Sequence, residues 1–168
     1  MKRTQTRKLA LAGLLTAVAV VGSMFSFPVL GSKCAPIQHM VNVICAVFLG
    51  PWYGVASAFV ASLLRNLLGL GSPMAFPGSM CGALLCGLMY RKLPRLLPTC
   101  MAEVFGTGIL GGLAAYPVAI YIIGQDAGQV AFYAYIVPFL ISTVVGSVIA
   151  GLALSALRST GALKTLTA

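Results

Sequence analysis

Long apolar runs fill the chain and are interrupted at short intervals by proline, glycine and charged residues. A hydrocarbon core about 30 Å thick takes roughly 20 apolar residues for each helical crossing. Runs of this kind, closed by helix-breaking residues, therefore predict membrane spans. We expect six, at residues 9–27, 37–49, 52–70, 74–90, 99–123 and 130–157.

The residues between these runs are typical of turns and interfaces. Gly50 and Pro51 predict a tight turn between the second and third spans, because proline cannot continue a helical hydrogen-bond ladder. Trp52 and Tyr53 follow, and aromatic pairs of this type favour the membrane–water interface. Residues 29–36 are expected to form a loop. Glycines spaced four residues from another small residue favour close packing of helices within a bundle.

Composition supports an integral membrane protein. Of the 168 residues, 60% are hydrophobic and only 8% charged, and the mean hydropathy is +1.00. A soluble domain would carry about 25% charged residues. The predicted fold class is therefore an all-α integral membrane protein, a six-transmembrane-helix bundle in which residues 1–168 form a single domain. The five cysteines form no CxxC pair and are interpreted as small hydrophobic residues.

The net charge of +9 would suggest nucleic acid as a partner in a soluble protein. Here the basic residues lie at the ends of apolar runs, where they set orientation, because positive loops resist translocation. Six spans with both termini in the cytoplasm put nine of the eleven basic residues on the inner side: Lys2, Arg3, Arg7, Lys8, Arg91, Lys92, Arg95, Arg158 and Lys164. The predicted localisation is a bacterial plasma membrane.

Polar side chains inside membrane segments are costly and point to functional sites. Gln38, His39 and Asn42 begin the second span, and their spacing lets them share one helix face. Arg65 and Asn66 lie in the outer part of the third span. These positions predict a solute cavity near the outer face, although His39 could instead cap its helix and Arg65 could extend to the interface.

Tyrosines add aromatic surface at the same end of the bundle. Tyr116 in the fifth span is a candidate wall of the cavity, whereas Tyr121, Tyr133 and Tyr135 are equally compatible with an interfacial belt. Glu103 lies near the cytoplasmic end of its span, so we expect it to pair with Arg91, Lys92 or Arg95 rather than with Arg65.

Sequence motifs in three stretches resemble the ThiW family. They are GSKCAPIQHMVNVICAVFLGPWYG (residues 31–54), LLRNLLGLGSPMAFPGSMCGALLCGLMYRK (residues 63–92) and AEVFGTGILGGLAAYPVA (residues 102–119). The resemblance implies a substrate-binding (S) component of an energy-coupling factor transporter, with a six-helix fold and a solute capped by the loop after the first helix. It further implies a thiazole precursor of thiamine as solute.

The resemblance also implies partners: a transmembrane coupling subunit and two cytosolic ATPase subunits. Small residues of the first helix would dock the coupling subunit, here Ala12 with Thr16 and Gly13 with Ala17, which depart from the usual AxxxA pattern. The family motifs contain Lys33, Gln38, His39, Asn42, Arg65 and Asn66. Together with Tyr116, these residues form the predicted substrate site.

Other function classes remain as alternatives. An intramembrane enzyme would need a motif such as HExxH or GxSxG, and the chain has one histidine, two acids and neither motif, so no catalytic residue, metal or cofactor is expected. Without a GxxxxGK[ST] loop the chain is not expected to hydrolyse ATP itself. A structural or assembly subunit without a solute, or an S component for a different vitamin precursor, remains possible from the sequence.

Overall fold

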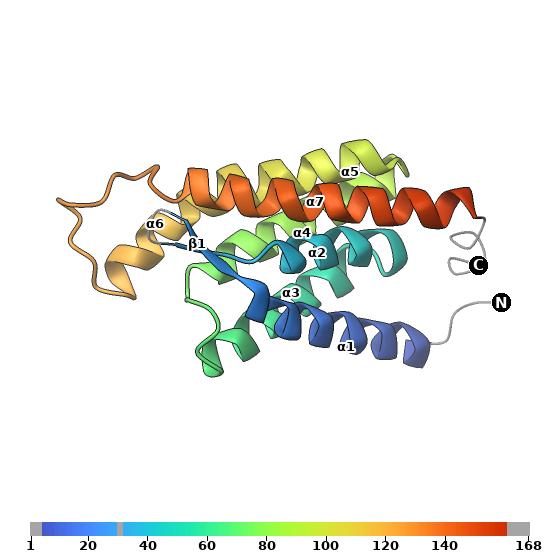
Figure 1. The fold of residues 1–168 in the computed structure, drawn as a ribbon, viewed down its shortest axis with the longest axis horizontal. Helices are drawn as coiled ribbons and strands as arrows, with labels where there is room; N and C mark the ends of the chain where they lie inside the picture. Colours follow the sequence, from blue (N-terminus) through green and yellow to red (C-terminus); the bar gives the residue numbers. More distant parts are fainter. Residues whose placement is uncertain (1–4, 30–31, 161–168) are drawn as a thin grey trace.

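A computed structural model describes residues 5–29 and 32–160 and shows a helical bundle with one short hairpin (Figure 1). Lys2, Arg3 and Lys164, which contributed to the predicted orientation, lie outside the described residues. Each of the six expected segments contains a helix. In chain order the elements are α1 (Gln5–Gly22), η1 (Ser23–Phe25), β1 (Phe27–Val29), β2 (Ser32–Cys34), α2 (Pro36–Phe48), α3 (Pro51–Leu67), α4 (Ala75–Lys92), α5 (Leu96–Glu103), η2 (Val104–Gly111), α6 (Gly112–Tyr121) and α7 (Ile136–Ser159).

The helices lie side by side along one axis (Figure 1). α4 packs against α3 on one side and η2 on another, and α2 packs against α7 and α4. The start of α1 and the end of α7 lie at one end of the bundle. The hairpin, α6 and the loop before α7 lie at the opposite end, which is called the hairpin end below.

Helix boundaries differ from the expected spans at the hairpin end. Instead of continuing to Phe27, α1 ends at Gly22, where an added Cβ would overlap the side chain of Ile37. β1 and β2 pair as the antiparallel strands of a hairpin, with Pro28 opposite Lys33, whereas the sequence predicted a loop from residue 29. The last helix begins at Ile136 rather than at residue 130.

Three helical stretches, Gln5–Phe25, Leu96–Tyr121 and Ile136–Ser159, are long and apolar enough to cross a membrane, as in a multi-pass membrane protein. Their outward faces are apolar; on α7, for example, Val148 is 55% and Leu152 68% exposed. Several of the most deeply buried side chains are polar. Apolar residues outside and polar residues inside are the reverse of the distribution in a soluble protein, and they suit a lipid environment.

Glycine allows α4 and η2 to approach backbone to backbone. A Cβ at Gly106 would lie 2.9 Å from the Cα of Gly82, and a Cβ at Gly111 would overlap the Cα of Gly78. η2 is a π-helical stretch, a rare geometry that is frequent at functional sites. The close approach lets side chains of η2 and the end of α5 reach the middle of the bundle.

A tight turn joins α2 to α3, as the sequence predicted. Gly50 adopts a φ of 85°, a left-handed conformation that glycine tolerates best, and Pro51 occupies the first position of α3. Proline is favoured there because its missing N–H would have no partner within the helix.

Candidate functional site

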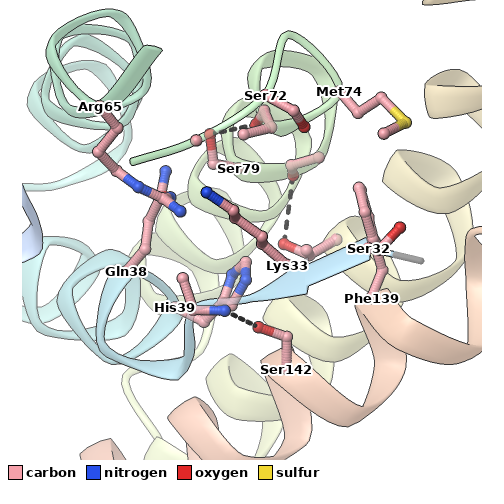
Figure 2. A pocket seen from close by; sticks show the side chains of 15 residues that line it. Ser32, Lys33, Gln38, His39, Arg65, Ser72, Met74, Ser79, Phe139 and Ser142 are labelled. Carbon is pink, nitrogen blue, oxygen red and sulfur yellow. Dashed lines mark hydrogen bonds between the residues drawn. The ribbon is translucent and has the colours of Figure 1, made fainter. Parts of the chain in front are cut away.

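A polar pocket lies at the hairpin end, between α2, α3, α4, η2 and α7, with the hairpin across it (Figure 2). The volume of this cavity is about 40 Å³. The polar side chains that line it are Ser32, Lys33, Gln38, His39, Arg65, Ser72, Ser79, Thr107 and Ser142, and the larger apolar ones are Met74 and Phe139.

The hairpin is fixed over the pocket by three hydrogen bonds. Lys33 Nζ donates to the carbonyl oxygen of Gly69 at 3.3 Å. The Cys34 thiol donates to the carbonyl of Pro138 at 3.1 Å, and the Ala35 N–H donates to Ser142 Oγ at 2.9 Å. Burial raises the pKa of the Cys34 thiol, which keeps its proton available for this bond. The hairpin is therefore tied both to α7 and to the loop after α3.

A chain of hydroxyl groups orients Gln38 on one wall. Ser79 Oγ donates to the carbonyl of Ala75 at 2.8 Å and so accepts from Ser62 Oγ, 2.9 Å away. Ser62 in turn accepts from Gln38 Nε2 at 3.1 Å. Because the Gln38 amide nitrogen is used in this way, its carbonyl oxygen remains available to a ligand.

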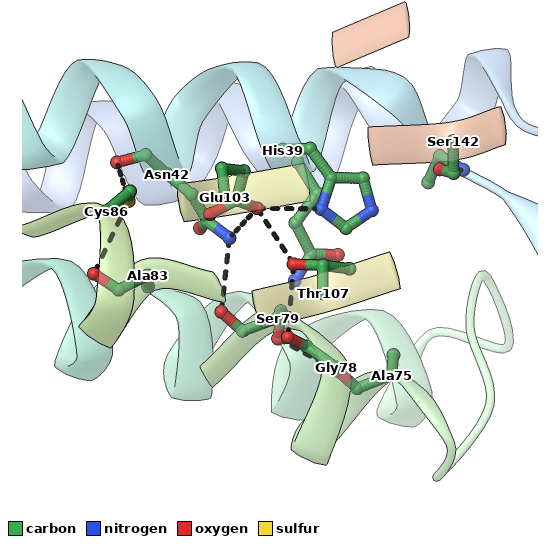
Figure 3. A network of polar contacts seen from close by, with 12 residues as sticks. His39, Asn42, Ala75, Gly78, Ser79, Ala83, Cys86, Glu103, Thr107 and Ser142 are labelled. Carbon is green, nitrogen blue, oxygen red and sulfur yellow. Dashed lines mark hydrogen bonds and ion pairs between the residues drawn. The ribbon is translucent and has the colours of Figure 1, made fainter. Parts of the chain in front are cut away.

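Glu103 forms the centre of a buried network beneath the pocket (Figure 3). Its Oε1 accepts from Asn42 Nδ2 at 3.0 Å and lies 3.1 Å from His39 Nδ1. Thr107 Oγ1 is 3.0 Å from the same oxygen and 3.2 Å from the Gly78 carbonyl oxygen. Accepting from His39 places a ring hydrogen on Nδ1, and in the tautomer that carries only this hydrogen Nε2 is an acceptor.

His39 lines the pocket, so its other ring nitrogen, Nε2, is the one that a ligand could contact. The His39 side chain is 10% exposed, whereas that of Glu103 is fully buried, and His39 lines the cavity. A carboxylate that orients a histidine in this way is a common arrangement where the imidazole must offer one defined nitrogen to a partner.

Arg65 enters the pocket from the last turn of α3 and is only 3% exposed. Its Nε has no hydrogen-bond partner among the described residues. A basic side chain at a helix C-terminus is favourable in the field of the helix dipole, but that interaction leaves the guanidinium donors free.

The structure separates the predicted site residues into two groups. Those that it brings together around the cavity are Lys33, Gln38, His39 and Arg65. Asn42 lies beneath them, bound to Glu103 and to the carbonyl of Ser79. Asn66 donates to the carbonyls of Ser62 and Ser72 and so holds the turn after α3. Tyr116 packs beside the cluster of Met74, Ala115, Ala119 and Tyr135 and is not among the lining residues.

The expected ion pair of Glu103 with the basic loop is wrong, since its partner is His39. The depth of α2 in the bundle is what the sequence does not give: its 13 residues match the length of the expected span at residues 37–49, but length alone does not place a helix along the bundle axis. Phe48 is the cytoplasmic end of α2 in the expected topology, and Leu96 is that of α5. At 1.5 Å per residue, Asn42 lies about 9 Å along α2 from Phe48, and Glu103 lies about 10 Å along α5 from Leu96. The two residues are therefore level.

Sequence reasoning also missed the serine and threonine residues of the site. Ser62 precedes Arg65 by three positions, and Thr107 follows Glu103 by four, so each shares a helix face with a charged residue. Helical spacing from these charged residues was the available signal. Ser142 gave no such signal, because small hydroxyl residues are common in transmembrane helices.

The first-helix residues expected to dock a partner are also divided. Ala12 and Thr16 are buried in the bundle, and Thr16 Oγ1 donates to the Ala12 carbonyl at 2.8 Å. Gly13 and Ala17 are exposed. Only this second pair lies on a surface that another protein could reach.

Comparison with known proteins gives the family. No curated protein matches the chain. The family match begins within α1, extends to the end of α7 and includes all the motifs that carried the resemblance. Its members are components of a transporter rather than enzymes. Because residues 9–160 match the family model described as thiamine-precursor transporter protein (ThiW), the chain belongs to that family, as its motifs predicted.

Proposed function

We propose that the chain is the substrate-capturing subunit of an energy-coupling factor importer in a bacterial plasma membrane. Its proposed solute is the thiazole alcohol that forms one moiety of thiamine. The observation that carries the proposal is the polar pocket beneath the hairpin, in which Gln38, His39 and Arg65 converge from two helices. Family membership supports a thiamine precursor as the class of solute.

The pocket offers each part of such a solute a suitable surface. Phe139 and Met74 provide apolar area for a heteroaromatic ring. His39 Nε2 accepts a hydrogen bond from the solute hydroxyl, and Arg65 donates to the thiazole ring nitrogen. Few fixed polar groups within an otherwise apolar wall are typical of small-molecule sites.

Capture requires the hairpin to move. A space of about 40 Å³ holds only a few waters, because one water needs roughly 10–15 Å³ of such volume. A substituted thiazole is several times larger than a water molecule. The three bonds that fix residues 33–35 to Gly69, Pro138 and Ser142 must therefore open together for the solute to enter, and they close over it afterwards.

The proposed topology has six spans with both chain ends in the cytoplasm, so the hairpin end faces outward. A transmembrane coupling subunit would dock on the exposed Gly13 and Ala17 of α1, where small residues permit close helix approach. Two cytosolic ATPase subunits would supply the energy for release of the solute on the inner side.

Titration of the purified chain with the thiazole alcohol tests the proposal. We expect saturable binding that Gln38→Ala weakens at least about tenfold, equivalent to about 1.4 kcal/mol. Tyr116→Phe is the matched control, because Tyr116 lies outside the pocket, and its affinity should stay within about twofold of wild type. The pyrimidine alcohol precursor of thiamine serves as the comparison solute. Absence of saturable thiazole binding, or unchanged affinity in Gln38→Ala, would refute the assignment.

A further inference from the structure

Positive charge is unbalanced in the pocket. Both Arg65 and Lys33 line it, and no acidic residue does so among the described residues. The chain has two acids in all. Glu103 is fully buried below, where it accepts from His39 and Asn42, and Asp126 accepts from the Gly128 N–H in an exposed loop. Neither carboxylate neutralises Arg65.

Burial of the Arg65 guanidinium without a counter-ion is energetically unfavourable. A guanidinium keeps its charge in a protein and has five N–H donors in a planar fork that fits an oxyanion. Here it is 3% exposed, and within the described chain its Nε has no acceptor. A buried charge without a counter-ion destabilises a fold. An arrangement of this kind gains most from an anion that arrives with a ligand.

Further donors face the same space. The Ser32 hydroxyl is buried, lines the pocket and lacks a hydrogen-bond partner among the described residues. In Figure 2 the Lys33 ammonium and the Arg65 guanidinium turn toward the same part of the pocket, beside Gln38. At 3.3 Å, the Lys33 bond to the Gly69 carbonyl is long and easily exchanged for a charged acceptor.

We propose that this pocket takes a precursor in an anionic form, with a phosphate or carboxylate group held by Arg65 and Lys33 and the ring placed against Phe139. The inference rests on the proposed function, because it names the charge class of the solute at that same site. Ser32 donates to the bound oxyanion, and the hairpin that carries Ser32 and Lys33 closes once the anion is in place.

The test compares three ligands that share one ring: the thiazole alcohol, its phosphate monoester and the analogue that carries a carboxylate. Binding is measured to the purified chain in a non-ionic maltoside detergent. For wild type we expect at least one anion to bind about tenfold more tightly than the alcohol, the usual advantage of a charge-assisted bidentate contact. Arg65→Gln should abolish that advantage, because the anions lose a charged partner and the neutral alcohol loses only a hydrogen-bond donor; the anion affinity should fall about tenfold more than that of the alcohol.

Two further variants keep the test decisive. Lys33→Gln changes an exposed side chain on the hairpin, so the fold is retained, and it should reduce the advantage of the anion about threefold or more. Arg95→Gln, an exposed cation at the opposite end of the chain's bundle, should leave all three affinities unchanged.

The outcomes separate this inference from the proposed function. If the alcohol binds as tightly as both anions, the inference is overturned and the proposed function stands. If none of the three ligands binds, both fail. Repetition in phospholipid nanodiscs tests a lipid headgroup as the source of the anion: an advantage that is present in detergent and lost in lipid would overturn the solute assignment.

Discussion

Glu103 shows how one residue can determine the chemistry of a site that it does not line. Its Oε1 lies 3.1 Å from His39 Nδ1 and accepts from Asn42 at 3.0 Å, and these contacts fix two side chains of α2 from a different helix. The carboxylate therefore positions the histidine, and it is the histidine that contacts the pocket. We therefore propose that Glu103 is a positioning residue and that Arg65 and His39 bind the solute.

At this scale we predict that Glu103→Ala destabilises the protein by roughly 2–4 kcal/mol, because His39, Asn42 and Thr107 lose a shared acceptor and each buried donor left unsatisfied costs about 1–3 kcal/mol. Thermal unfolding in detergent measures the effect. Asp126→Ala is the control, since Asp126 is the other acid of the chain and lies in an exposed loop. Equal unfolding temperatures for the two variants would contradict the network.

Individual polar residues were the most predictable part of the site. Lys33, Gln38, His39 and Arg65 could be selected because charged and amide groups are rare in apolar segments. Their mutual contacts could not, because they depend on how far each helix is set into the bundle. Because the depth of each helix is unknown from sequence, Asn42 was expected in the cavity rather than beneath it, and Glu103 was expected to pair with the basic loop at the cytoplasmic end.

Among the elements, the position of α2 along the bundle accounts for the misplaced residues. Its length agrees with the expected span at residues 37–49, since both have 13 residues, or about 20 Å at 1.5 Å per residue. The helical stretch Leu96–Tyr121 has 26 residues, so the length of α2 does not fix its depth beside that stretch, and its N-terminal end lies beneath the hairpin. The apolar pattern predicts that a helix exists here but contains no information on its depth.

The hairpin itself was not predicted, because residues 27–34 contain a proline and no alternation of polar and apolar residues long enough to indicate a strand. Its attachment to α7 depends on contacts between residues more than a hundred positions apart. Contacts of this range are fixed by the tertiary fold and leave no local signal.

We predict that Ser142→Ala increases the rate of ligand release several-fold. The substitution removes the acceptor of the Ala35 N–H, a bond that contributes about 1 kcal/mol when made, and so favours the open hairpin. Stopped-flow measurement of release is the appropriate assay. Ser155→Ala, an exposed serine on the same helix, should have no effect. If both variants release ligand at the wild-type rate, the hairpin does not control access.

At the scale of the whole molecule, the surface is divided by function. The pocket lies at the hairpin end, and the exposed Gly13 and Ala17 lie along α1, so the proposed solute site and the proposed docking surface for a coupling subunit are separate. With separate surfaces, the coupling subunit could bind this chain without contacting the solute.

Bulky residues on α1 should therefore affect assembly alone. We predict that Gly13→Leu together with Ala17→Leu prevents co-purification with the coupling subunit, because the added side chains keep two helices from close approach. Solute affinity should stay within about twofold of wild type, because neither residue lines the pocket. An added Cβ at Gly13 meets nothing within 4 Å, so the fold itself tolerates the change. Ser155→Leu is the control. Normal assembly of the double variant would place the docking surface elsewhere.

We propose above all that the pocket beneath the hairpin captures a thiamine precursor. The decisive measurement is mass spectrometry of the small molecules that co-purify with the chain from cells supplied with thiazole precursors. We expect a thiazole precursor with the wild-type protein and its loss from Gln38→Ala at equal protein yield. Recovery of no precursor from wild type, or of equal amounts from both proteins, would show that the pocket does not capture one.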